Sequence, residues 1–471
     1  MRKNVKALVQ IAFILVFSIA ACTLIFFEEI VCGLNMQASY HYADEAVFAM
    51  PDPDFTGVEY DAGKTKNTSV IIDTAQEDST PDISSDAVHV SAVSEKREFK
   101  KPSEGGNISS GASEEKAPPL AVIPSKIQGL HEAMFYTQLP SQKVQCQLCF
   151  RRCTIDNGKR GFCRARQNID GKLYSLTYGR PAAVHIDPIE KIPLSHVLPG
   201  KDALCLGTAA CNLRCLNCIN WEFALKAPEE VESVPVTPEE IIKMAKDNGL
   251  NMICFTYNEP TICYEYMTDI FKLARKEGIT TAMHSNASMN PEPLLALLPY
   301  VDAVAADLKG FSSEFYKDNC SSELEPVLTF LKTVKNSGVW LEVINLVIPG
   351  RSDSGEMIRD MSTWFSENLG SDTPLQFSRF FPTHKLSGLP PTPIRTLEDA
   401  CKSVSDAGLD YVYMGNVPGS SLYNTYCPDC KELLIERKGL VIRSFNIEDG
   451  KCSYCGKEIS GLWGNKQKEI K

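Results

Sequence analysis

The sequence has no excess of positive charge. Its 471 residues contain 48 Lys and Arg against 59 Asp and Glu, so the formal net charge is -11. Proteins that bind nucleic acid neutralise phosphates with basic side chains, and this balance therefore argues against DNA or RNA as a partner. The chain is 44% hydrophobic and 23% charged, which suffices for one large or two medium domains.

Residues that could build a core are scarce between about residue 45 and residue 125. This stretch is rich in Ser, Asp, Glu, Lys and Pro. Because such a segment cannot bury enough apolar surface to fold, residues 31–130 are predicted to form a disordered linker.

The linker is preceded by an apolar run at 8–27, which has about the length that spans a bilayer. Basic residues come before this run and acidic residues follow it. Residues 1–30 are therefore predicted to be a signal anchor or transmembrane segment. The alternative is that the start of the chain is misassigned.

The loop at 211–218 contains three cysteines and lacks a fourth. Cys211, Cys215 and Cys218 stand close together among small or polar residues, which suits neither a core nor a disulfide pair with a spare thiol. Converging thiolates are ligands of a soft metal centre, and a [4Fe-4S] cluster takes one thiolate per iron. Three ligands leave one iron open, and an open position lets a metal centre act on a substrate.

Short apolar runs alternate with amphipathic segments from about residue 131 onward. One such segment, 237–249, has Thr237 as a predicted N-cap and Pro238 at the first helical position. Repeated βα units predict an α/β fold whose parallel sheet forms a partial TIM-like (β/α) barrel. The predicted strands are 203–207, 251–257, 279–285, 302–309, 339–349, 374–380 and 411–415.

In such a barrel the active-site residues lie on the loops at the carboxyl ends of the strands. The cysteine loop follows the first predicted strand, Asn258 and Glu259 follow the second, and Asp307 and Lys309 end the fourth. Each charged residue taken alone is an ordinary surface feature. Their shared position at strand ends favours contacts with a ligand.

These motifs resemble the radical S-adenosylmethionine (SAM) superfamily, and more narrowly the radical SAM enzyme of the AmmeMemoRadiSam system, a relative of the pyruvate formate-lyase activating enzymes. The resemblance covers 131–463. The stretches that carry it include CQLCFRRCTIDNGKRGFCRAR (146–166), CNLRCLNCINWE (211–222), FTYNEPTICYEY (255–266), DLKGF (307–311), LVIPGRSDS (346–354) and YVYMGNVPG (411–419).

The resemblance implies a [4Fe-4S] cluster on Cys211, Cys215 and Cys218 whose open iron binds SAM. Reductive cleavage of SAM to a 5'-deoxyadenosyl radical would then abstract hydrogen from a substrate that the sequence does not identify. The resemblance also implies SAM contacts from a second set of residues, with Glu259 receiving the amino group. That set is Asn258, Glu259, Asn286, Asp307 and Lys309. Ala287 stands where relatives usually carry Gly, which predicts a strained loop because Ala tolerates positive φ poorly.

Two further cysteine groups flank the barrel. Two CxxC pairs near the carboxyl end are typical of a zinc-ribbon-like knuckle pair: Cys427, Cys430, Cys452 and Cys455. A four-cysteine set lies on the amino side: Cys146, Cys149, Cys153 and Cys163. Zinc and an auxiliary iron-sulfur cluster both fit this second set, and its spacing does not decide between them, although we slightly favour zinc or a structural role. The predicted domains are thus a Cys-rich segment at 131–200, a barrel at 201–420 and a metal-binding tail at 421–471.

The sequence is compatible with three functions. The first is a radical SAM enzyme that takes electrons from a donor such as flavodoxin or ferredoxin, with AmmeMemoRadiSam-system proteins as further partners. The second is an activating enzyme for a glycyl-radical enzyme, and the third is a non-catalytic, membrane-tethered metal-binding protein. Charge bias predicts that the barrel lies outside the membrane, whereas dependence on SAM and reductant predicts the cytoplasmic side, which we prefer.

Overall fold

The computed structural model describes residues 130–464 of the chain. The predicted membrane segment at 1–30 and almost all of the predicted linker lie outside the described residues, so both stay predictions. Within 130–464, no helix is both long and apolar enough to cross a membrane.

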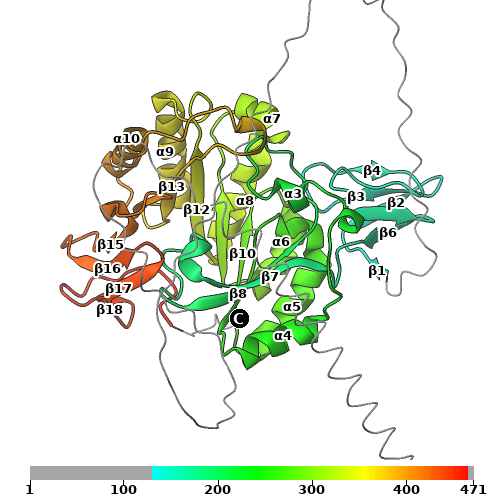
Figure 1. The fold of residues 1–471 in the computed structure, drawn as a ribbon, viewed down its shortest axis with the longest axis horizontal. Helices are drawn as coiled ribbons and strands as arrows, with labels where there is room; N and C mark the ends of the chain where they lie inside the picture. The colour runs from blue at the N-terminus through cyan, green and yellow to red at the C-terminus, as the bar shows by residue number, and fades with distance from the viewer. Residues whose placement is uncertain (1–129, 465–471) are drawn as a thin grey trace, which may run out of the picture. The chain divides into compact units, whose positions relative to one another are not determined.

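An eight-stranded sheet forms the centre of the described structure (Figure 1). Its strand order is β14-β13-β12-β11-β10-β9-β8-β7. Strands β8 to β14 all run parallel, and β7 pairs antiparallel with β8 at one edge. No ladder in the described part of the chain closes β14 onto β7, so the sheet is an open, partial barrel.

The seven parallel strands correspond to the seven predicted apolar runs, which confirms the α/β fold with a parallel sheet. The edge strand β7 was not predicted. The bounds are β7 Pro181–Pro188, β8 Asp202–Thr208, β9 Met252–Phe255, β10 Thr280–Ser285, β11 Ala303–Asp307, β12 Trp340–Val347, β13 Leu375–Arg379 and β14 Val412–Gly415.

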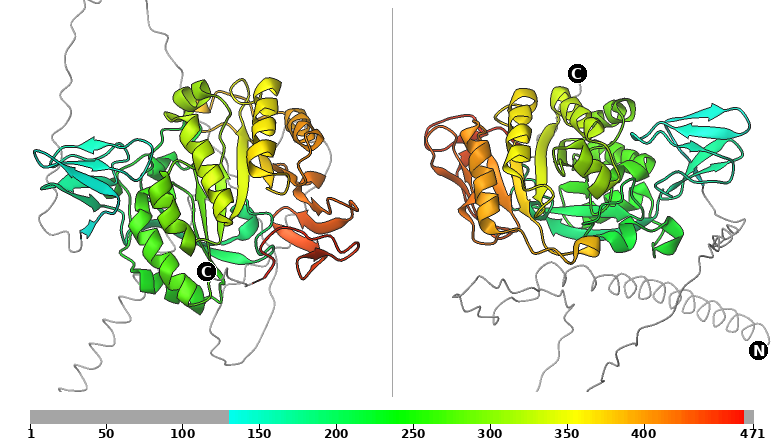
Figure 2. Two further views of the ribbon diagram at one scale, coloured as in Figure 1. Left: turned by 180° about the vertical axis from the view of Figure 1, so that it is seen from behind. Right: turned by 90° about the horizontal axis from the view of Figure 1, so that it is seen from above.

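Helices connect successive parallel strands and cover the outer face of the sheet (Figure 2). They are α3 Trp221–Ala224, α4 Pro238–Asp247, α5 Tyr264–Lys276, α6 Pro291–Leu297, α7 Ser313–Cys320, α8 Leu324–Ser337, α9 Gly355–Leu369 and α10 Ile394–Asp406. Short 3-10 turns accompany them: η2 Ile189–Lys191, η3 Pro228–Glu230, η4 Pro260–Cys263, η5 Leu298–Tyr300, η6 His384–Leu386 and η7 Ser421–Tyr423.

Helix α4 begins at the predicted cap. The Thr237 hydroxyl accepts a hydrogen bond from the amide of Glu240 at 3.2 Å, and the Glu240 carboxylate accepts one from the amide of Thr237 at 2.7 Å. This reciprocal capping box satisfies amide groups that the first helical turn leaves without partners. The prediction of Thr237 as N-cap is confirmed.

The core has two layers because side chains alternate between the faces of each strand. The outer layer is large and lies between the sheet and the helices. The inner layer combines small strand residues, including Cys205, Cys254, Ala282, Ala303 and Ala305, with larger apolar side chains from the segment that joins β7 and β8.

The Cys-rich N-terminal segment forms two small antiparallel sheets, ordered β1-β6-β5 and β2-β3-β4. Their strands are β1 His131–Glu132, β2 Tyr136–Leu139, β3 Lys143–Cys146, β4 Thr154–Ile155, β5 Arg166–Ile169 and β6 Lys172–Ser175. A buried ion pair between Arg166 of β5 and Glu265 of α5 joins this segment to the barrel. Their side chains are 2% and 1% exposed, and Glu265 also accepts the amide of Met134 at 2.7 Å.

The C-terminal tail adds a three-stranded sheet, β15-β16-β17, and a hairpin of β18 and β19. The bounds are β15 Thr425–Tyr426, β16 Leu433–Lys438, β17 Val441–Phe445, β18 Ile447–Glu448 and β19 Lys451–Cys452. The buried imidazole of His196 joins this tail to the barrel: Nδ1 lies 2.7 Å from the carbonyl of Ser460, and Nε2 lies 2.6 Å from the hydroxyl of Tyr413. Figures 1 and 2 show the tail and the N-terminal sheets on opposite flanks of the central sheet.

The buried ion pair makes the attachment of the Cys-rich segment testable. Glu265→Gln leaves the Arg166 charge buried without a counter-charge, so we expect the free energy of unfolding to fall by about 3–5 kcal/mol in urea titrations. Glu132→Gln is the matched control, because the Glu132–Lys172 pair lies at the surface and its loss should leave stability almost unchanged. Equal effects of the two changes would contradict the anchoring role.

Candidate functional site

Polar and thiol side chains gather where four neighbouring parallel strands end. The cysteine loop follows β8, Glu259 lies beyond β9, Asn286 follows β10, and Asp307 is the last residue of β11. These strands are adjacent in the sheet, so their carboxyl ends lie side by side. As expected from the sequence, these residues therefore lie along one edge of the sheet.

The three thiols of the loop affect one another electrostatically. Burial raises the pKa of Cys211 well above its ordinary value, and the nearby Glu259 and Cys215 raise it further. Burial, together with Cys215, also raises the pKa of Cys218 to about 11. Cys211 and Cys218 are therefore neutral thiols in the metal-free protein, and a metal that binds this donor set would have to release their protons.

Asn258 fastens the start of the cysteine loop to the end of β9. Its side-chain amide donates to the carbonyl of Ala210 at 2.8 Å and to the hydroxyl of Thr208 at 3.2 Å. Its side-chain oxygen accepts the amide of Thr208 at 3.1 Å. All three bonds go to the protein, so Asn258 positions the loop that carries Cys211.

Glu259 is almost fully buried, with 1% of its surface exposed. Its carboxylate accepts the amide of Asn286 at 2.7 Å, the hydroxyl of Ser285 at 2.9 Å and the amide of Thr261 at 3.0 Å, and it also accepts the Thr261 hydroxyl. Burial raises the pKa of Glu259, although these bonds oppose the rise. The carboxylate thus faces the chain and fixes the end of β10.

Asn286 links the end of β10 to the cysteine loop. Its side-chain amide lies 3.8 Å from the Cys211 sulfur and 2.9 Å from the side-chain oxygen of Asn212. Its own side-chain oxygen accepts the hydroxyl of Ser288. A chain of hydrogen bonds therefore runs from Glu259 through Asn286 to Cys211.

Asp307 and Lys309 form a partly exposed charged pair together with His284. Lys309 Nζ lies 2.6 Å from one Asp307 oxygen, and His284 Nε2 lies 3.0 Å from the other. Burial alone would raise the pKa of Asp307, but Lys309 and His284 outweigh it and hold that pKa well below its usual range. With 20% of its side chain exposed, Lys309 offers a fixed positive charge at the mouth of the sheet.

Two residues of this site, Cys320 and His284, were not predicted from the sequence. Cys320, at the end of α7, interacts with Cys215, and this interaction lowers the pKa of the Cys215 thiol and raises that of Cys320. His284 faces the same side of β10 as Asn286, two residues later, and that alternation was the available signal. Nothing in the sequence marked Cys320, which is about a hundred residues from the loop.

Backbone strain surrounds the site. Ala210, Tyr257 and Ala287 have φ values of 76°, 68° and 58°. Non-glycine residues in this region typically cost about 1–3 kcal/mol each and persist where the surrounding structure holds them. The positive φ of Ala287 confirms the strain predicted from the absence of Gly at that position.

The C-terminal cysteines converge on one point. Within 130–464, Cys427, Cys430, Cys452 and Cys455 are the only Cys, His, Asp or Glu group with three or more ligand atoms within 4.8 Å of one another. The sulfur atoms of Cys427 and Cys455 are 3.6 Å apart, and those of Cys430 and Cys452 are 3.7 Å apart.

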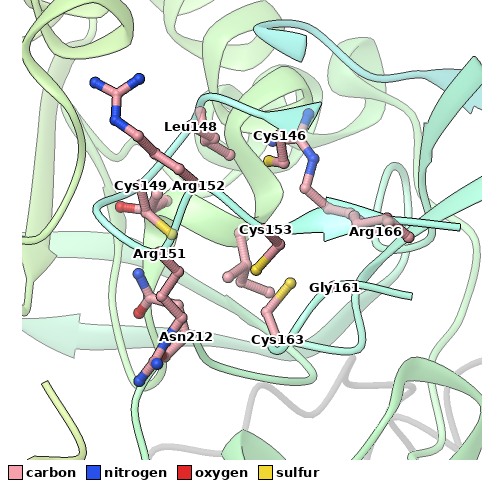
Figure 3. Close-up of a pocket in the computed structure, with 13 residues that line it drawn as sticks. Cys146, Leu148, Cys149, Arg151, Arg152, Cys153, Gly161, Cys163, Arg166 and Asn212 are labelled. Atoms are coloured by element: carbon pink, nitrogen blue, oxygen red, sulfur yellow. The ribbon is translucent and has the colours of Figure 1, made fainter. Parts of the chain in front are cut away.

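The N-terminal cysteines instead surround a small cavity of about 20 Å³ (Figure 3). Cys146, Cys149, Cys153 and Cys163 line it together with Arg151 and Arg166, and Asn212 of the cysteine loop closes one side. The structure thus brings all four members of this set together, next to the loop that carries Cys211.

Comparisons with known proteins agree with this arrangement. The model of the radical SAM superfamily matches residues 206–361. An uncharacterized protein of Methanocaldococcus jannaschii is 44% identical over 332 residues, which cover 70% of this chain and 99% of that protein. The pyruvate formate-lyase-activating enzyme of Clostridium pasteurianum is 28% identical over 161 residues, which cover 32% of this chain and 64% of that enzyme.

Among solved structures, Streptococcus suis SuiB bound to S-adenosylmethionine aligns with a TM-score of 0.38 and 15% identity, over 50% of this chain and 54% of SuiB. The family match begins inside β8 and runs through the cysteine loop and the strand ends that surround it. The chain therefore belongs to the radical SAM superfamily of enzymes and is homologous to the pyruvate formate-lyase-activating enzymes.

Proposed function

We propose that this enzyme holds one [4Fe-4S] cluster on Cys211, Cys215 and Cys218 and uses it to cleave SAM reductively. The observation that carries the proposal is a three-thiol loop at the carboxyl end of the first parallel strand. When bound, the cluster supplies one electron to SAM, with formation of methionine and a 5'-deoxyadenosyl radical that takes hydrogen from a substrate. Four irons with three thiolate ligands leave one position for SAM.

The surrounding residues take distinct roles in this proposal. Asn258 and Glu259 are positioning residues, because their polar atoms bind the loop and the end of β10. Asn286 donates toward the Cys211 sulfur and so steadies a ligand thiolate. Lys309, held by Asp307, is the partly exposed cation that can receive the carboxylate of SAM.

Electrons reach radical SAM enzymes from an external donor, and we propose a flavodoxin or ferredoxin for this one. The substrate is open between two classes. The likeness to a pyruvate formate-lyase-activating enzyme favours a protein substrate in which a glycyl radical is installed. The motifs shared with the AmmeMemoRadiSam enzyme favour another protein or small molecule, and we propose membership of that system.

We also propose that the C-terminal knuckle pair binds structural zinc. Zinc–thiolate bonds of about 2.3 Å in a tetrahedron place the sulfur atoms about 3.8 Å apart. The two measured separations of 3.6 and 3.7 Å agree with that spacing. A closed four-thiolate site leaves no position for a substrate, so its role is to fold the tail.

Replacement of the three loop cysteines tests the proposed cluster. In a Cys211→Ala, Cys215→Ala, Cys218→Ala variant reconstituted without oxygen, we expect 5'-deoxyadenosine formation from SAM to fall to background, because no ligand for the SAM-binding cluster remains. Cys401→Ala, which removes a buried thiol of α10, is the control and should keep the activity. Undiminished 5'-deoxyadenosine in the triple variant would refute the proposal.

Replacement of Glu259 tests whether its hydrogen bonds hold the cysteine loop. Glu259→Gln turns an NH₂ group toward hydrogen-bond donors, so the free energy of unfolding should fall by about 1–3 kcal/mol. Because Glu259 fixes Asn286 beside Cys211, the variant should also lose iron faster on gel filtration. Glu222→Gln makes the same change at an exposed position, where less than about 0.5 kcal/mol is expected. A Glu259→Gln protein as stable as wild type would show that these bonds do not hold the loop.

Metal analysis of the C-terminal knuckle pair tests the proposed zinc site. The wild-type chain should contain zinc by elemental analysis, and Cys452→Ser should abolish its binding. Hydrogen exchange in 421–464 should then rise more than tenfold, because the free energy of binding structural zinc, about 10–16 kcal/mol in peptides, is folding free energy. Cys401→Ser serves as the matched control. A zinc-free wild-type protein with a well-protected tail would contradict this role.

A further inference from the structure

We infer that the cavity between the four N-terminal cysteines is a second iron-sulfur site, with Cys146, Cys149, Cys153 and Cys163 as its ligands. None of Cys211, Cys215 and Cys218 lines this cavity, but Asn212, the neighbour of Cys211 in the chain, does (Figure 3). The inference does not depend on cleavage of SAM, because four protein ligands would fill every thiolate position of the cluster.

The size and lining of the cavity limit what it can hold. About 20 Å³ is far below the roughly 300–1,000 Å³ of pockets that take organic ligands. Four cysteine side chains line this one cavity, and thiolates held together away from water need a compact positive partner. A metal ion or a small inorganic cluster satisfies both conditions.

The spacing of the sulfur atoms separates these two candidates. A single tetrahedral ion requires four sulfur atoms at the separation seen in the C-terminal knuckle pair. The N-terminal set does not reach that spacing, since the knuckle pair is the only described group whose ligand atoms fall within 4.8 Å of one another. The three sulfur atoms of the Cys211 set do not all fall within 4.8 Å of one another either. Wider spacing suits a cluster, in which each thiolate binds a different iron.

A buried cation with two unsatisfied donor atoms lines the same cavity. Arg166 is 2% exposed, and its Nε and Nη1 atoms have no hydrogen-bond partner within the described part of the chain. Only its Nη2 group is engaged, by Glu265 and by the carbonyl of Met134. Buried donors without partners are costly, and a cluster with four thiolates is an anion whose sulfur atoms accept hydrogen bonds. Arg166 therefore provides donors that an iron-sulfur cluster would satisfy.

One side chain connects the two cysteine sets. Asn212 lines the N-terminal cavity beside Cys149, and its side-chain oxygen lies 3.9 Å from the Cys211 sulfur. Arg151 adds a bond from its Nε to the carbonyl of Asn212 at 2.6 Å. The two cysteine sets are thus separated by a single side chain, that of Asn212.

The experiment counts metals in the full chain after anaerobic reconstitution with iron and sulfide. The Cys211→Ala, Cys215→Ala, Cys218→Ala variant should retain iron and sulfide, about four of each for a [4Fe-4S] cluster or two for a [2Fe-2S] cluster. Its reduced electron paramagnetic resonance (EPR) spectrum should not change on addition of SAM. A Cys153→Ala, Cys163→Ala variant should lose that same iron, and Cys401→Ala should lose none.

Three results would overturn the inference. They are a triple variant without iron and sulfide, a wild-type protein with two zinc ions per chain, and a double variant with the iron content of wild type. The triple variant and the wild-type zinc count decide the question even when the double variant fails to fold. Failure of the proposed function has a different signature, because it would show as absent 5'-deoxyadenosine in protein that still holds its iron.

Discussion

The hydrogen-bonded links between the ends of β8, β9 and β10 are the constraint on which the site depends. Three thiolates beside one another repel, and the loop that carries them contains strained residues such as Ala210. Asn258 holds the start of the loop, and Glu259 holds the end of β10 through Asn286, which reaches Cys211. These bonds hold the loop in place, so the protein itself fixes the positions from which the three cysteines would bind the proposed cluster.

The two flanking segments extend this arrangement by different means. The buried Arg166–Glu265 pair brings the N-terminal cysteines against the loop. His196 attaches the C-terminal tail to the other flank of the barrel through Ser460 and Tyr413. The first attachment places thiols next to the site. The second attachment holds the tail on the opposite flank, where the four C-terminal cysteines are close enough together to bind a single metal ion.

Much of this organisation could be predicted from local sequence. The seven parallel strands follow from apolar runs, the start of α4 follows from Thr237, and the cysteine loop follows from spacing alone. The antiparallel strand β7, the small N-terminal sheets and the contact of Cys320 with Cys215 could not be predicted, because they depend on which distant segments meet. Glu259 is the instructive case: the motif marks it as a ligand contact, whereas its burial and four hydrogen bonds favour a role in positioning.

The central claim is that one iron of the Cys211 cluster lacks a protein ligand and binds SAM. Electron-nuclear double resonance on the reduced, reconstituted enzyme, with the amino nitrogen of SAM isotopically labelled, tests it directly. The account predicts a changed EPR signal and a hyperfine coupling between the labelled nitrogen and the cluster. An unchanged signal without coupling would contradict it and would indicate a fourth protein ligand, for which Cys320 beside Cys215 is the candidate.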